Sequence, residues 1–510
     1  MEEEMIMKKI FNIIATAVFC ISSLTACHKD LDIVYDNALS ASIMWKDPSD
    51  LEQSVPAIYQ RIRSYFAGAE CNVFYFGEIR VGDYMWGPSL ESKVQDNFKI
   101  ACRHNTMNGS NTIGWSGLYT AIDQANAVLA HSSTCGAPED RVKWANAQAY
   151  FARAFCYFYA ARIWGEVPLN LLPVESTDQA ECYPEQVSAD KVYEQVEIDL
   201  AECEKLGDVL GNEKYFGTKD AFNMLKAEYA LWMYSTRNGD KTKYLGMAET
   251  ALNAIGISES KLLSNYSSIF DRNNKKNSEI IFALNNTASS AAGYQQYFCQ
   301  PSNLIKAEAR CNNGGPVPIM STQWWSYSQE FVDKFKAQEA LGDKRVSTNL
   351  GYGPYSALDG HEITWCNKLL GDMSKAPVIL DNDLLYYRYA LAVMFHAELK
   401  YYQGNYSEAL KSLNMVAKRA YGKDNFYTDA TSSKVLDAIV NEYYLEFPAE
   451  GVIWWALIRT GKIWDMAPNS EDPSTTFASL RAKNPNILLW PIANGSMTKN
   501  HKIHQIEGWS

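Results

Sequence analysis

The feature that most constrains the fold is a helical hairpin predicted between Asn382 and Gly422. On both sides of a break at Gly404-Asn405, apolar residues recur three and four positions apart, which is the helical period rather than the strand period. Glycine followed by asparagine ends a helix and begins a short turn. Small residues would let the two helices approach closely, at Ala390, Ala397, Ala409 and Ala417. Such a unit buries its apolar face only against neighbouring units, so further copies are expected.

Two other stretches repeat this design. Each is an alanine-rich pair of helices, predicted at Trp144–Ile163 with Ser188–Leu206 and at Thr218–Thr236 with Leu245–Ile255. The order of small and aromatic residues in the first hairpin resembles a tetratricopeptide repeat, through Ala397, Gly404, Tyr406, Ala409 and Leu410. We therefore predict a mainly α fold, a tetratricopeptide-like scaffold with helices around 144–255 and 382–422, long irregular loops and a few short strands.

Outside these pairs, further helices and two loop-rich regions are predicted. The helices cover Ser49–Ala67, which follows the start signal Asp47-Pro48-Ser49, then Trp115–Leu129 and Val435–Glu446. Residues 261–381 are rich in Asn, Ser, Gly, Pro and aromatic residues, with a strand-like run at Glu279–Leu284. Together with residues 70–112, this region is expected to carry the function, because long irregular insertions in a scaffold usually do.

The N-terminus has the features of a secretory signal. Lys8-Lys9 precede the apolar run Ile10–Ser23, which is too short to span a membrane. A signal peptide normally begins with positive charge, whereas Glu2-Glu3-Glu4 are negative, so Met7 is predicted to be the true start. No other stretch approaches the length of a transmembrane helix.

The apolar run closes with Leu24-Thr25-Ala26-Cys27, which resembles a bacterial lipobox. By this resemblance, signal peptidase II would cut before Cys27 and the new amino terminus would be acylated, each buried methylene adding about 0.8 kcal/mol of membrane affinity. The alternative is an ordinary signal peptide with a chance cysteine. We predict a signal peptide at 1–26 and a single domain at 27–510, anchored in outer-membrane lipid. Lys29-Asp30-Leu31-Asp32 is similar to the start of lipoproteins displayed on the outer surface in Bacteroidota.

Charge and cysteine content exclude several classes of protein. A net charge of −12 without a cluster of Lys and Arg argues against a nucleic-acid partner. No two of the eleven cysteines form a Cys-x-x-Cys pair, so zinc ribbons and redox dithiols are not supported. The nine cysteines outside the leader are scattered, which favours buried small apolar residues over a disulfide framework.

Motifs spread along the whole chain resemble the SusD/RagB family of outer-membrane nutrient-binding lipoproteins. Each motif alone is weak, but all of them follow in the same order. They are the lipobox at Cys27, Gly77-Glu78-Ile79-Arg80…Asp83, Trp115…Tyr119…Ile122…Asn126, Arg153…Trp164-Gly165…Val167-Pro168-Leu169, Arg388-Tyr389-Ala390…Ala397-Glu398, Glu446-Phe447…Glu450-Gly451, and Pro491-Ile492…Asn500…Gln505.

The resemblance implies a helical scaffold that faces a TonB-dependent transporter of the SusC type. A loop-rich face would bind nutrient, most often a glycan, and deliver it into the transporter. No catalysis, cofactor or metal is expected. Some relatives serve peptide transporters, so a peptide ligand is the alternative within the family.

A sugar offers an apolar face and a polar rim, so its site needs flat aromatic rings flanked by amide and carboxylate groups. Two groups of residues meet this need. The first is Tyr84 and Trp86 with Asn97, and the second is Tyr294, Tyr297 and Phe298 with Trp324-Trp325 and Tyr327. The alternative for Trp324-Trp325 is that they begin a helix and pack inward. The tryptophans in patterned helices or family motifs are expected in the core, namely Trp115, Trp164, Trp454 and Trp455.

One departure from the family pattern concerns an ion network near Glu442. The positions where the family has Arg and Asp hold Tyr443, Ile453 and Ala456 here. A partly buried network would lose its cations, and apolar packing can replace such a network at little cost. We therefore expect Glu446 and Glu450 to find backbone partners or Arg459.

A surface glycoside hydrolase is the rival from another class, because paired carboxylates can hydrolyse a glycosidic bond. Glu446 and Glu450 could share a helix face only if the helix survived Pro448, which is unfavourable. Glu78 and Asp83 could pair in space. The sequence holds no nucleophile elbow, phosphate-binding loop, dinucleotide fingerprint or zinc-protease spacing. Asp381-Asn382-Asp383 could suggest calcium but fits better as a helix N-cap.

Overall fold

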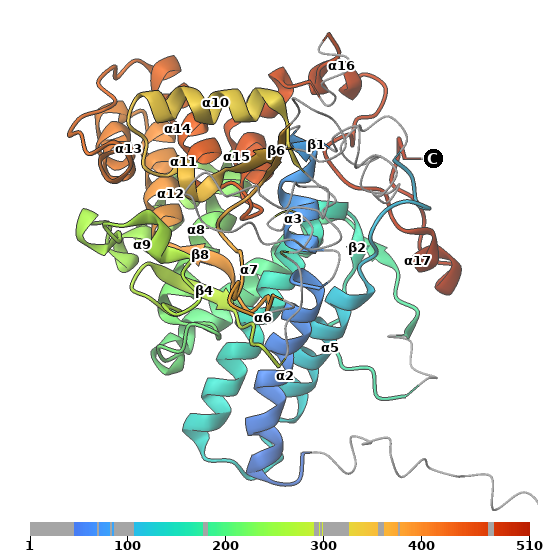
Figure 1. The fold of residues 1–510 in the computed structure, drawn as a ribbon. Helices are drawn as coiled ribbons and strands as arrows, with labels where there is room; N and C mark the ends of the chain where they lie inside the picture. The colour runs from blue at the N-terminus through green and yellow to red at the C-terminus, as the bar shows by residue number, and fades with distance from the viewer. Residues whose placement is uncertain are drawn as a thin grey trace, which may run out of the picture. The chain divides into compact units, whose positions relative to one another are not determined.

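Three helical hairpins organise the fold in the computed structural model of the chain (Figure 1). In each of them two helices that follow one another in the chain pack together. The pairs are α6 (Glu139–Trp164) with α7 (Ala189–Lys205), α8 (Lys219–Thr236) with α9 (Lys241–Ile255), and α12 (Tyr389–Tyr402) with α13 (Tyr406–Tyr421). The three predicted pairs are confirmed, and so is the mainly α, tetratricopeptide-like fold.

The structure describes residues 45–68, 71–81, 84–85, 107–176, 182–289, 295, 298, 326–354, 362–375, 378–467 and 474–509. Asp47–Ser510 form one compact unit. The predicted signal peptide and Cys27 lie outside the described residues, so both stay predictions. In the described ranges, no helix combines the length and the apolar character needed to cross a membrane.

The ends of the predicted helices follow the local sequence. The first, α2 (Pro48–Phe66), begins with a capping box in which the Asp47 side chain accepts from the backbone of the first turn. In the hairpin that ends with α13, Gly404 adopts a φ of 81° between the two helices, as its predicted role as a helix stop requires.

Small and aromatic residues fill the core as predicted. The hairpin alanines Ala390, Ala397, Ala409 and Ala417 are completely buried, and the core tryptophans Trp115, Trp164, Trp454 and Trp455 are buried as well. The cysteines in the described part of the chain carry free thiols, and all of them except Cys182 are buried. The buried cysteines therefore act as small apolar residues.

The start of the first predicted hairpin is wrong, because residues 384–388 form a strand. This strand, β8 (Leu384–Arg388), pairs antiparallel with β4 (Ile280–Leu284), and the register places Leu284 opposite Leu384. The strand predicted near Glu279–Leu284 is thus confirmed, and its partner is the segment assigned to a helix. A short apolar run fits both periods, and here the backbone partner β4 decides in favour of the strand.

Asp381-Asn382-Asp383 is not a helix N-cap, which corrects a second prediction. The residue at the N-cap of α12 is Arg388. Asp381 instead accepts two hydrogen bonds from Arg272, at 2.7 and 2.9 Å. Asp383 accepts from Lys275 at 2.9 Å and from the Tyr215 hydroxyl at 2.8 Å.

The remaining elements surround the hairpins. They include three more two-stranded antiparallel sheets, β1 (Tyr84–Met85) with β5 (Ser326–Tyr327), β2 (Val167–Pro168) with β3 (Gln186–Val187), and β6 (Gly351–Pro354) with β7 (Glu362–Trp365). The other helices are α3 (Asn72–Gly77), η1 (Ile79–Val81), α5 (Ser116–His131), η3 (Gly207–Val209), η4 (Glu259–Lys261), η5 (Tyr266–Ile269), α10 (Gln329–Ala340), α11 (Val346–Asn349), α14 (Ser432–Glu446), α15 (Ile453–Thr460), η7 (Lys462–Asp465), α16 (Phe477–Arg481) and α17 (Asn494–Lys499).

Candidate functional site

Two segments far apart in the sequence meet at the strand pair β1–β5. Tyr84 lies opposite Tyr327, and Met85 lies opposite Ser326. Paired strands hold their backbones about 5 Å apart. Trp86 is the next residue after Met85, and Trp325 is the residue before Ser326. Trp86 and Trp325, one from each candidate group, are therefore adjacent in sequence to paired positions of one strand pair.

Most of the predicted ligand-binding residues lie outside the described residues. Tyr84 is described through its backbone in β1. The others are Trp86, Asn97, Tyr294, Tyr297, Trp324 and Trp325, and their roles stay predictions. The residues that follow Trp325 form β5, and the nearest helix, α10, begins at Gln329.

Tyr327 fixes the strand pair to the protein interior, so its prediction as a ligand contact was wrong. Its side chain is buried, and its hydroxyl donates to the Asn349 carbonyl oxygen at 3.0 Å. Its ring packs against Phe331, with 4.9 Å between the ring centroids. The Thr364 hydroxyl of β7 donates to the Tyr327 carbonyl oxygen at 3.4 Å. The strand pair is therefore held from several elements.

A second anchor lies where the other candidate segment passes α3. The rings of Phe74 and Phe298 stack in parallel, with centroids 4.3 Å apart. The backbone N–H of Cys366, the residue after β7, donates to the Phe298 carbonyl oxygen at 2.9 Å. This backbone contact and the stacked rings hold Phe298 beside both α3 and the end of β7. The Phe298 side chain is buried, so its prediction as a ligand contact was wrong.

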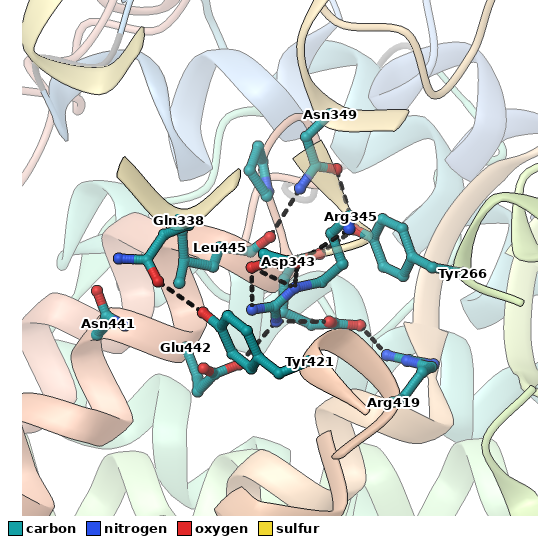
Figure 2. Close-up of polar contacts among 12 residues, drawn as sticks. Tyr266, Gln338, Asp343, Arg345, Asn349, Arg419, Tyr421, Asn441, Glu442 and Leu445 are labelled. Carbon is teal, nitrogen blue, oxygen red and sulfur yellow. Dashed lines mark hydrogen bonds and ion pairs between the residues drawn. The ribbon is translucent and has the colours of Figure 1, made fainter. Parts of the chain in front are cut away.

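A buried ion network connects this region to the helical scaffold, and it corrects the prediction that the network is lost. Arg345, which precedes α11, donates from Nη1 to Glu442 at 2.7 Å and to Glu446 at 3.0 Å. Its other side-chain nitrogens donate to Asp343, at 2.7 Å for Nη2. Figure 2 shows this guanidinium between Asp343 and Glu442, with Arg419 nearby.

Cations from three other elements complete the network. Arg388 donates to Glu446 at 2.7 Å and to both oxygens of Glu450, at 2.6 and 2.9 Å. Arg419 of α13 bonds to Glu446 and also to Glu279, at 2.8 Å. Lys368 donates to Glu450 at 2.7 Å and to the Pro448 carbonyl oxygen at 2.8 Å. Both Glu446 and Glu450 are therefore buried and paired.

Arg459 has another partner, so its predicted role was wrong. It donates to both carboxylate oxygens of Glu398, each at 2.9 Å. The hydroxyl of Tyr443 bonds to the same carboxylate. At the position where the family pattern has an arginine, Tyr443 thus supplies a neutral donor, and Arg345, Arg388 and Arg419 supply the cations for Glu446 from elsewhere in the chain.

The network sets the protonation of its members. Burial raises the pKa of the Glu446 carboxyl, but Arg419, Arg388 and Arg345 outweigh burial and hold this pKa well below its ordinary value. Burial raises the pKa of Glu442, although Arg345 opposes the rise. Burial lowers the pKa of the Lys368 ammonium, against the effect of Glu450. Charges this deeply buried persist because each one has partners.

A short path leads from the network to the strand pair. Arg345 stands at the start of α11, and Asn349 is the last residue of that helix. The side-chain amide of Asn349 donates to the Leu445 carbonyl oxygen of α14 at 2.7 Å, as Figure 2 shows. The backbone carbonyl of the same residue accepts from Tyr327. The network therefore positions the strands from which the candidate loops extend.

The carboxylates considered for hydrolysis are engaged in these contacts or in similar ones. The helix α14 ends at Glu446, before Pro448, as predicted. Glu78 is completely buried and accepts from the backbone N–H groups of Ala449 and Gly451, at 2.8 and 2.9 Å. Asp83 lies outside the described residues. Among the residues that are described, no group of three or more His, Cys, Asp or Glu side chains is placed to hold a metal ion.

A cavity of about 650 Å³ lies between α2, α5 and the start of α3. Polar side chains contribute most of its lining, with Gln60, Arg61, Ser64, Asn72 and Thr120 among them. Asn72 is buried, and its Oδ1 atom has no hydrogen-bond partner within the described ranges. Buried polar atoms are normally paired, so this oxygen is available to a donor from a ligand. Sequence reasoning missed Asn72, because a single Asn beside a helix start carries no recognisable signal.

Helical hairpins joined by a buried ion network define a tetratricopeptide-like scaffold. Two family models match the chain, one described as "SusD family" at residues 364–509 and one as "Starch-binding associating with outer membrane" at residues 50–226. A SusD-like protein of Formosa agariphila is 24% identical, with 98% of this chain and 99% of that protein covered. The chain belongs to the SusD/RagB family.

Solved structures share the fold over nearly the whole chain. NanU of Bacteroides fragilis is 25% identical with a TM-score of 0.75, covering 93% of this chain and 99% of that one. Surface glycan-binding protein A of Bacteroides thetaiotaomicron, solved in complex with laminarihexaose, is 20% identical with a TM-score of 0.69, covering 90% of this chain and 99% of that one. These similarities agree with the tetratricopeptide-like fold of the described residues.

Proposed function

We propose that the protein is a cell-surface lipoprotein that captures an oligosaccharide or polysaccharide and delivers it to a SusC-like TonB-dependent transporter. It acts by binding, without catalysis. The anchor is an acylated Cys27 in the outer membrane, and the binding face is turned to the outside. Membership of the SusD/RagB family supports this function, as does the likeness to a glycan-binding protein solved with laminarihexaose.

The observation that carries the proposal is the strand pair β1–β5. It brings the segments that lead to Trp86 and to Trp324-Trp325 to adjacent backbone positions, although more than two hundred residues separate them in the chain. Flat aromatic rings from two segments can grip a sugar ring on its apolar faces. The other predicted contacts are Tyr84, Asn97, Tyr294 and Tyr297.

The cavity between α2, α5 and the start of α3 offers polar groups that suit a glycan. Sugar hydroxyls are both donors and acceptors, and the Ser64 and Thr120 hydroxyls with the Gln60 amide match that chemistry. The Oδ1 atom of Asn72, unpaired within the described ranges, can accept from one hydroxyl of the ligand. We include Asn72 among the proposed ligand contacts for this reason.

Isothermal titration calorimetry tests the proposal with two matched panels, one of soluble glycans and one of peptides. We expect binding to a glycan, with affinity lost in Trp86→Ala and Trp324→Ala and weakened in Asn72→Ala. The matched control is Tyr406→Ala, which removes a half-buried aromatic ring from α13, at the scaffold. Binding to peptides alone would favour a peptide transporter.

An activity assay separates binding from hydrolysis. The same glycans, incubated with the purified protein, should release no reducing ends. Release that disappears in a carboxylate variant would replace the proposal with a glycoside hydrolase.

A further inference from the structure

We infer that the glycan captured by this protein is acidic and that Arg61 recognises its negative group. This group is a carboxylate or a sulfate ester, because both offer a guanidinium a pair of anionic oxygen acceptors. The inference rests on the proposed function, which supplies a glycan, and it names the chemical class of that glycan.

Two cavities adjoin at Arg61. The cavity of about 650 Å³ between α2, α5 and the start of α3 has Arg61 and Thr120 in its lining. The same two residues line a second cavity, of about 470 Å³, between α5, α17 and the segment that joins β2 to β3. The helices α2 and α5 pack side by side (Figure 1). We call the two cavities together the α2–α5 groove, and each has a volume typical of a ligand site.

Arg61 stands out among the arginines because its guanidinium has no direct partner in the described ranges. A guanidinium carries five N–H donors and a permanent positive charge. Every other arginine that the structure describes forms a hydrogen bond or lies over an aromatic ring. On the same helix, Arg63 donates to the Asn285 carbonyl oxygen at 3.1 Å. The donors of Arg61 are therefore available to a ligand.

The charge of the α2–α5 groove favours an anion. Its charged lining residues are Arg61, Lys499 and Asp123. Burial raises the pKa of the Asp123 carboxyl, and attraction by Arg61 opposes this rise. The Asp123 carboxylate accepts from the Val174 backbone N–H at 2.8 Å. Two cations thus accompany one carboxylate, in a chain whose net charge is −12. This local excess of positive charge attracts a negative ligand.

Neutral groups in the groove match the rest of a sugar. Asn72 lines the first cavity, is 6% exposed, and has an Oδ1 atom without a hydrogen-bond partner in the described ranges. Trp115 and the half-buried Tyr119 line the second cavity, together with Ser116. A sugar hydroxyl can donate to an amide oxygen, and an apolar sugar face can lie on an aromatic ring. Arg61 adds to these contacts the requirement for a negative group.

Hydrogen bonds fix the walls of the groove. The Tyr65 hydroxyl of the first cavity donates to the Gly114 carbonyl oxygen of the second at 3.3 Å. The Asn500 side-chain amide donates to the Pro184 carbonyl oxygen at 2.7 Å, and both residues line the second cavity. A site with ordered walls loses little conformational entropy when a ligand binds. The groove is therefore prepared for its ligand before binding.

A glycan array followed by isothermal titration calorimetry tests the class of ligand. The purified full chain is offered neutral, carboxylated and sulfated oligosaccharides, including oligogalacturonate, its methyl ester, a sulfated dextran oligosaccharide and laminarihexaose. We expect acidic glycans to bind, and their affinity to fall as the salt concentration rises. Whether carboxylated or sulfated members bind identifies the source of the negative group. Removing that group from the bound glycan should weaken binding about tenfold or more.

Variants of α2 test the role of Arg61. With the acidic glycan that binds, Arg61→Gln should lower the affinity about tenfold or more, and Arg61→Lys should lower it less, because lysine keeps the charge but not the paired donors. The matched control is Arg63→Gln, which removes the same charge two positions along the helix and lines neither cavity. We expect the control to stay within about twofold. The same glycan without its negative group should bind Arg61→Gln and the unaltered chain equally.

Three results would overturn the inference. Binding to neutral glycans alone would remove the acidic class and leave the proposed function intact. Equal losses in Arg61→Gln and Arg63→Gln would show general attraction between charges instead of recognition by Arg61. Binding to peptides alone, or to no glycan on the array, would refute the proposed function and the inference with it.

Discussion

The hydroxyl of Tyr327 lies 3.0 Å from the carbonyl oxygen of Asn349, and this bond joins the strand pair β1–β5 to the last residue of α11. Tyr327→Phe keeps the ring packing and removes the bond. We expect a loss of about 0.5–1.5 kcal/mol in the free energy of unfolding, because a buried carbonyl loses its donor. Hydrogen exchange should quicken at the backbone amides of β1 and β5 and stay unchanged in α13. Unchanged exchange at both strands would show that this bond does not hold them.

Glu446 is the centre of the buried ion network, so its charge should matter for stability. Glu446→Gln keeps the size of the side chain and leaves Arg345, Arg388 and Arg419 without their common counter-charge. Breaking a buried ion pair by removing one partner costs about 3–5 kcal/mol. Urea unfolding measures the difference, with Glu339→Gln on the exposed face of α10 as the control. A loss no greater than in this control would contradict the central role of Glu446.

The difference in unfolding free energy between the unaltered chain and Glu446→Gln should also depend on pH. Burial acts to raise the pKa of Glu446, but the three arginines together hold it well below its ordinary value in the folded state. Its contribution to stability is therefore complete above the unfolded pKa of about 4.3 and is lost as pH falls through the folded pKa. The stability difference between the two proteins should be largest near neutral pH and should shrink below about pH 4. A difference that grows in acid would refute the assignment.

Gly77 and Gly451 meet where two family motifs touch. A Cβ on Gly451 would stand 2.5 Å from the Val73 carbonyl oxygen, and the residue has a φ of 70°. Gly461 has a φ of 73° but nothing within 4 Å of such a Cβ. We expect Gly451→Ala to cost about 1–3 kcal/mol more than Gly461→Ala, because only the first adds overpacking to backbone strain. Thermal unfolding of both variants checks this, and equal losses would contradict it.

The anchor has its own test. Cys27→Ser removes the thiol that would carry the diacylglycerol, so radioactive palmitate should no longer label the protein in cells. A chain with Cys20→Ser should be labelled normally, because that cysteine precedes the predicted cleavage site. Labelling that survives Cys27→Ser would show that Cys27 is not the acylated residue.

The helical scaffold could be predicted from the sequence because its signals are local. Periodic apolar residues and Gly404 indicated the hairpins, and Asp47 marked the start of α2. The strand β8 could not be recognised, since its apolar run continues into the pattern of α12 and only its partner β4 distinguishes strand from helix.

The ion network was missed for a related reason. Its cations Arg345, Arg388 and Arg419 come from three separate elements, whereas the prediction looked for replacements close to Glu446 in the chain. Asn72 was missed as well. Its amide oxygen has no hydrogen-bond partner in the described structure, and only the packing around it, not the sequence, reveals this. The meeting of β1 with β5 likewise depends on contacts between distant segments.

Strand β8 ends at Arg388 and helix α12 begins at Tyr389, with no residue between them. One inserted residue on the strand side would turn the following side chains to the opposite face of the sheet. One on the helix side would rotate the apolar stripe of α12 by about 100°. Insertions and deletions at this junction are therefore harmful. Length differences among related chains should occur in the loops and not within residues 384–402.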